Sequence, residues 1–165
     1  MCWILSVSDH LSLLRNAEQG RYCQLFVNAM KLKRLHFQPI HGKALDIVAA
    51  ILQTEEVSSA GKAFGVIRLV AEELVMNIVN YAYPNGGDDY LDVEIECDEK
   101  HITLRFRDGG VPFNPLEQAP PDISLPMEQR RIGGLGFFIV TKKMDSVEYE
   151  YTDGENVLTV MKVIK

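Results

Sequence analysis

Apolar side chains recur at steps of three and four between residues 44 and 83, and this period predicts two helices. The first begins at Ala44, and Ser58-Ser59-Ala60-Gly61 ends it. The second runs from about Lys62 to Tyr83, because the following Pro84-Asn85-Gly86-Gly87 cannot continue a helix. Its apolar stripe consists of Ile67, Val70, Ala71, Leu74, Ile78 and Ala82.

A period of two predicts strands on both sides of these helices. Residues 91–97 and 102–106 alternate cleanly, and their polar faces are acidic on one strand and basic on the other, as expected of an antiparallel hairpin. A short strand is expected at Leu35 to Phe37, a short helix from Leu135 to Met144, and a closing hairpin at 147–151 and 157–164. The pattern predicts an α+β two-layer sandwich, with helices on one face of the sheet.

The size and charge of the chain narrow its class. The 165 residues are enough for one domain, which we place at 32–165 behind an unassigned leader at 1–31. A net charge of -6 argues against nucleic acid or an anionic membrane as a partner. Cys2, Cys23 and Cys97 form neither a zinc pattern nor a disulfide framework, and no apolar run reaches the length of a membrane span, so a cytoplasmic protein is expected.

Polar residues lie along one edge of the second predicted helix. Glu73, Asn77 and Asn80 follow each other at steps of four and three beside the apolar stripe. A carboxylate there can accept a proton from a hydroxyl group, and an amide oxygen one turn later can bind Mg²⁺. Polar residues at the edge of an amphipathic helix are more often simply solvated, so this segment alone does not decide the function.

Two glycine-containing segments add candidate ligand contacts. Asp108-Gly109-Gly110 follows a predicted strand; it reads either as a turn or as the base of a pocket where Asp108 accepts a hydrogen bond from an exocyclic amine. Gly133-Gly134-Leu135-Gly136 opens a predicted helix, a setting in which backbone N–H groups can face phosphate. Arg130 and Arg131 precede it after a long irregular connection at 109–132 that has the length of a functional lid.

In this order, the three segments resemble the N, G1 and G2 boxes of the GHKL (histidine-kinase-like) ATPases. Within that superfamily, the segments 73–83, 108–115, 133–140 and 144–156 are similar to the anti-sigma-factor serine/threonine kinases. The resemblance covers about residue 32 to the end, and it implies the Bergerat ATP-binding fold with a mixed, mostly antiparallel sheet. The family often has His where Tyr81 stands, and often one lid arginine where this chain has two.

The resemblance also implies roles for particular residues. Glu73 would be the general base, Asn77 the Mg²⁺ ligand and Asp108 the reader of adenine. The remaining residues implied in nucleotide binding are Gly110, Arg131, Gly133, Gly134, Leu135, Gly136 and Thr159.

The expected function is that of an ATP- and Mg²⁺-dependent protein serine/threonine kinase. It would phosphorylate an anti-anti-sigma (STAS-type) protein and sequester a sigma factor, and the family resemblance also implies a homodimer. Two alternatives stay open. One is a nucleotide-gated binding module that transfers nothing. The other is the ATPase domain of a histidine kinase, which needs a helical hairpin that presents a phosphate-accepting histidine, whereas His36 and His41 stand beside a proline in a predicted strand and loop.

Overall fold

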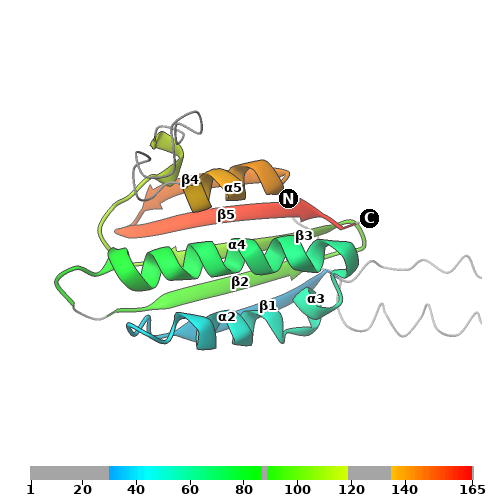
Figure 1. Ribbon diagram of the computed structural model, residues 1–165, viewed down its shortest axis with the longest axis horizontal. Coiled ribbons are helices and arrows are strands. Elements are labelled where there is room, and N and C mark those ends of the chain that lie inside the picture. The colour runs from blue at the N-terminus through cyan, green and yellow to red at the C-terminus, as the bar shows by residue number, and fades with distance from the viewer. Residues whose placement is uncertain (1–29, 87–88, 119–134, 165) are drawn as a thin grey trace, which may run out of the picture.

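The computed structural model describes residues 30–86, 89–118 and 135–164, which form one sheet with helices on one face (Figure 1). The strands are β1 (Lys31–Phe37), β2 (Leu91–Cys97), β3 (His101–Asp108), β4 (Ser146–Thr152) and β5 (Glu155–Val163). The α-helices are α2 (Ala44–Leu52), α3 (Glu55–Ser58), α4 (Phe64–Asn77) and α5 (Leu135–Lys143). Shorter helical turns are η2 (Gly61–Ala63), η3 (Ile78–Ala82) and η4 (Pro115–Glu117).

The sheet has the strand order β1-β2-β3-β5-β4 and is antiparallel at every pairing in the described part of the chain. The expected two-layer α+β fold is therefore confirmed, while the mixed sheet that the resemblance implied is antiparallel here. The predicted charge pairing is also present: Glu94 stands opposite Arg105, and their side chains form an ion pair at 2.6 Å.

The core lies between α4 and the inner face of the sheet (Figure 1). Ile67, Val70 and Ala71 of the predicted stripe are fully buried, and the inner residues of β2 and β3 meet them.

We expect Ile67→Ala to lower the free energy of unfolding by about 2–5 kcal/mol, because it removes methylene groups and leaves a cavity. Chemical denaturation of the variant beside Lys62→Ala, an exposed control, measures this loss, and equal stabilities would contradict the packing described.

The first strand is longer than predicted. β1 begins at Lys31, although only Leu35 and Phe37 show apolar alternation. The upstream half is polar and exposed; backbone pairing with β2 and the ion pairs Arg34–Glu94 and Lys31–Glu55 hold it. Backbone pairing carries no apolar signature, so the hydrophobic pattern could not locate the start of this strand.

The second predicted helix is divided into three parts. A 3₁₀ turn, η2, leads into α4, and α4 continues into η3, a π-helical turn. Short π-helical segments inside helices often occur at functional sites. The first predicted helix is also divided, because α2 ends at Leu52 and α3 follows, ending at the first residue of the predicted breaker Ser58-Ser59-Ala60-Gly61. The first turn of α3 is capped by Thr54, which accepts a hydrogen bond from the Val57 N–H.

The predicted irregular connection is described only in its first part, residues 109–118, where η4 occurs. The remainder of that connection and the leader lie outside the described residues. Within the ranges that the structure covers, no helix combines the length and apolar character needed to cross a membrane.

Candidate functional site

A buried carboxylate stands at the end of β3. Asp108 is 5% exposed because it is the last inward-facing residue of the strand, following Ile102, Leu104 and Phe106. Its Oδ1 accepts hydrogen bonds from the Gly110 N–H at 2.9 Å and from Nδ2 of Asn156 at 3.0 Å. Burial raises the pKa of Asp108, and these two donors oppose the rise by stabilising the charged form.

Asn156 is the residue of β5 that stands directly opposite Asp108. Asn156 is 7% exposed, and its carboxamide uses both its nitrogen and its oxygen in hydrogen bonds. Nδ2 also approaches the carbonyl oxygens of Gly110 at 3.4 Å and Val111 at 3.1 Å, while Oδ1 accepts from the Phe113 N–H at 3.1 Å and the Tyr149 hydroxyl at 2.7 Å. One side chain thus ties residues 108–113 to the sheet.

The turn after Asp108 packs closely against the end of η3. The Val111 N–H donates to the Ala82 carbonyl oxygen at 2.8 Å. A Cβ atom added at Gly110 would lie 2.5 Å from that oxygen and 2.7 Å from the Ala82 Cβ. Glycine is therefore required here for close backbone approach.

Two tyrosines hold the other side of the turn. The Tyr83 hydroxyl accepts from the Gly109 N–H at 2.9 Å and from the Tyr90 N–H at 3.2 Å, and it donates to the Tyr90 carbonyl oxygen at 2.7 Å. The Tyr90 hydroxyl bonds to Glu155, whose other oxygen lies 3.4 Å from Nε of Arg107. The backbone that follows Asp108 is therefore fixed from both sides.

The predicted base, Glu73, meets Gly136, the last glycine of the predicted glycine loop. Glu73 is half-buried on α4, and a Cβ added at Gly136 of α5 would overlap its carboxylate. Glu73 forms no hydrogen bond or ion pair with any residue in the ranges 30–86, 89–118 and 135–164. Asn77 is exposed one turn further along α4, and Leu135 is exposed at the start of α5. The carboxylate is thus available at the helix end where phosphate binding is expected.

The structure does not bring every predicted site residue to this place. Arg130, Arg131, Gly133 and Gly134 lie outside the described residues. Thr159 pairs with Arg105, and strand alternation puts it on the sheet face opposite to Asp108. The polar residue of β5 on the Asp108 face is Asn156, so the expectation that Thr159 supports the adenine side is not met by this register.

The sequence pattern did not indicate a role in this candidate site for Asn156, Tyr83 or Tyr90. One signal could have found the first of them. Asn156, Leu158 and Val160 alternate on one face of β5, so a polar residue heads a buried face. The two tyrosines act through hydroxyl bonds to backbone atoms, which no periodic pattern indicates.

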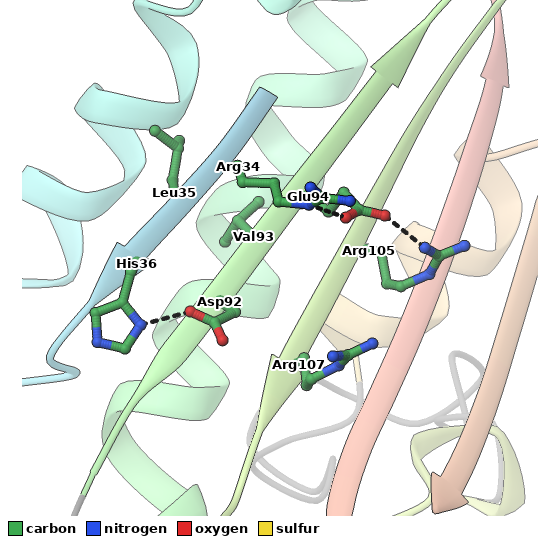
Figure 2. Close-up of a pocket in the computed structure, with 8 residues that line it drawn as sticks. All are labelled: Arg34, Leu35, His36, Asp92, Val93, Glu94, Arg105 and Arg107. Carbon is green, nitrogen blue, oxygen red and sulfur yellow. Dashed lines mark hydrogen bonds and ion pairs between the residues drawn. The ribbon is translucent and has the colours of Figure 1, made fainter. Parts of the chain in front are cut away.

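A separate groove lies on the open face of the sheet (Figure 2). Its charged side chains are already paired: Arg34 and Arg105 both contact Glu94, and His36 contacts Asp92. Strand alternation places these residues away from Asp108 and α4. Within the described ranges, no group of three or more His, Cys, Asp or Glu side chains could hold a metal ion.

Comparison with known proteins gives a consistent family. A model of the histidine kinase-like ATPase domain matches residues 40–162. The serine-protein kinase RsbW of Listeria monocytogenes is 31% identical over 96 residues, covering 56% of this chain and 61% of RsbW. The anti-sigma F factor of Clostridium beijerinckii is 25% identical over 96 residues, covering 58% and 67%.

A third relative is the serine/threonine-protein kinase BtrW of Bordetella bronchiseptica. It is 24% identical over 94 residues, covering 57% of this chain and 66% of BtrW. The chain thus spans less than two thirds of the length of the Listeria kinase that it matches.

Proposed function

Because the chain belongs to the histidine kinase-like ATPase domain family, we propose that it binds ATP with Mg²⁺ and phosphorylates a serine or threonine of an anti-anti-sigma partner. We also propose that the protein binds a sigma factor, forms a homodimer and acts in the cytoplasm. The single observation that carries it is the meeting of the Glu73 carboxylate with Gly136 at the start of α5. Relatives named as serine-protein kinase and anti-sigma factor support it.

The residues at the site fit a nucleotide. Asp108 offers a buried acceptor for an exocyclic amine, and the absence of a side chain at Gly110 permits the turn to pack tightly beside it. The start of α5 offers backbone N–H groups and the positive end of a helix dipole to phosphate. Asn77 is exposed near Glu73 and offers an amide oxygen, which suits a Mg²⁺ ion that keeps several waters.

Within this site each residue has a distinct task. ATP supplies the phosphoryl group and Mg²⁺ offsets its charge. Glu73 orients the hydroxyl group of the partner and accepts its proton, since no described residue competes for its oxygens. Catalysis in such a site depends mainly on position and charge stabilisation. The Arg130-Arg131 pair is proposed to contribute a phosphate contact, which follows from its place before the glycine loop.

A histidine-kinase type of transfer has less support. His36 lies on β1, where its ring contacts Asp92 at 2.5 Å, and His41 lies in a turn. Neither is on a helical hairpin of the kind that presents a phosphate-accepting histidine. The binding module without transfer remains the competing hypothesis, because it would use the same nucleotide site.

The proposed function is tested by incubating the full chain with labelled ATP, Mg²⁺ and candidate anti-anti-sigma proteins. Transfer of label to a serine or threonine of one partner is expected. No transfer to any of these partners, with ATP binding retained, would favour the binding module instead.

The Mg²⁺ ligand is tested separately by thermal shift. Mg·ATP should raise the melting temperature of the wild type, and Asn77→Ala should reduce the rise by weakening Mg²⁺ binding. The matched control is Asn85→Ala, an exposed asparagine in the loop after η3, which should behave as the wild type. An equal rise in all three proteins would contradict the assignment of Asn77.

A further inference from the structure

We propose that Asn156 is the positioning residue that sets base specificity, because it keeps Asp108 as a hydrogen-bond acceptor. This inference rests on the proposed nucleotide site. It concerns a residue that does not have to contact the nucleotide and that acts through the carboxylate beside it. The carrying observation is the bond of 3.0 Å from Nδ2 of Asn156 to Oδ1 of Asp108, between two side chains that are both buried.

The orientation of the Asn156 carboxamide is fixed by groups that can only donate or only accept. The backbone N–H of Phe113 must donate, so the atom that faces it at 3.1 Å is the oxygen Oδ1. The carbonyl oxygens of Gly110 and Val111 must accept, so the atom that faces them is the nitrogen Nδ2. The carboxamide cannot be reversed without breaking these bonds. Asp108 therefore always meets a donor.

A fixed donor on one oxygen determines what the carboxylate offers to a ligand. Asn156 and the Gly110 N–H both donate to Oδ1 of Asp108. These bonds stabilise the charged carboxylate and partly offset burial, which on balance raises the pKa of Asp108. A charged carboxylate accepts from the 6-amino group of adenine. The 6-carbonyl oxygen of hypoxanthine or guanine is itself an acceptor, so no hydrogen bond forms between it and the carboxylate. Two unpaired acceptors facing each other in a buried site are unfavourable.

Removing the Asn156 side chain as a donor should weaken the preference for adenine. Asn156→Leu keeps a similar volume and takes away the bond to Asp108, so protonated Asp108 becomes easier to form and can donate to a base carbonyl. We expect wild type to bind ADP at least ~100-fold more tightly than IDP. In Asn156→Leu this ratio should fall at least about tenfold, and the pH below which ADP affinity declines should move upward, since a less stabilised carboxylate has a higher pKa.

The control is Tyr149→Phe. It removes the hydroxyl that donates to Oδ1 of Asn156 and leaves the Nδ2 bonds in place. It should keep the ADP-to-IDP ratio and the pH profile of the wild type. A purely structural role for Asn156 would instead weaken ADP and IDP equally, with an unchanged ratio and an unmoved pH profile, and that result would overturn the inference.

The experiment is calorimetric titration of the full chain with Mg·ADP and Mg·IDP between about pH 5 and 8, the range in which a raised carboxyl pKa becomes visible. Absence of ADP binding by the wild type would overturn the proposed function together with this inference. ADP binding by the wild type with an unchanged ratio in Asn156→Leu would overturn the inference alone. Should that variant fail to fold, the side-chain amide signals of Asn156 in the wild type carry the test: slow hydrogen exchange and a shift on adding ADP support it, and free exchange without a shift overturns it.

Discussion

Replacing Glu73 with glutamine should lower the rate of phosphotransfer by about 10²–10⁴-fold while leaving the dissociation constant for Mg·ADP near its wild-type value. The glutamine side chain has the same shape, so α4 and its contact with Gly136 are kept. It cannot accept a proton from the partner hydroxyl. Single-turnover transfer to the partner, measured beside an ADP titration of the same variant, separates the two effects.

The matched control is Glu72→Gln on the same helix. Glu72 pairs with Arg68 at 2.8 Å within α4, so its neutralisation should leave transfer unchanged. Equal transfer by wild type and Glu73→Gln would remove the general base from the proposal. A loss of ADP binding in Glu73→Gln would show that the residue supports the nucleotide rather than the reaction.

Replacing Asp108 with asparagine should weaken or reverse the preference for ADP over IDP. The amide oxygen of the variant can still accept from Asn156 and from the Gly110 N–H, because both donors face the same atom, Oδ1, in the wild type. The amide nitrogen of the variant then points toward the ligand. It is a donor, so it cannot form a hydrogen bond with the 6-amino group of adenine, which is also a donor. We expect ADP affinity to fall at least ~100-fold, and IDP affinity to fall less or to rise.

Titrations with both nucleotides check this result. Asp92→Asn is the matched control, because Asp92 lies on the open face of the sheet and contacts His36 (Figure 2). It should bind ADP as the wild type does. If Asp108→Asn kept the wild-type affinity for ADP, adenine would not bind at Asp108. The buried carboxylate would then no longer support the proposed function.

Elements with a strong apolar period could be predicted well from the sequence. The hairpin of β2 and β3 lies where strict alternation put it, and α5 begins at Leu135 as expected. Elements held by other forces were predicted less well. The polar start of β1 depends on backbone pairing and ion pairs. In η3 the helical turn is wider, and Val79 is buried there while Ile78 and Ala82 of the predicted stripe are only half-buried.

The candidate site shows the same division. Glu73 and Asp108 could be proposed because a carboxylate at the edge of an apolar stripe or before two glycines is visible in the sequence. For Asn156, alternation with Leu158 and Val160 indicates a buried face of β5 that Thr159 does not share, but only the register of β3 with β5 shows that this is the face of Asp108. Register depends on contacts between distant segments, and a one-residue shift moves a side chain to the other face.

Hydrogen exchange at the Val111 N–H, which donates to the Ala82 carbonyl oxygen, can report on the contact between η3 and the turn after Asp108. The last carbonyl groups of a helix have no partner within the helix, and here the Ala82 oxygen finds one in the backbone N–H that follows the Asp108 turn. Any loosening of the turn or of η3 must break this bond and expose that N–H to solvent. The exchange rate of one backbone proton therefore records how firmly two distant segments of the chain are joined, in the empty protein and through each change of nucleotide.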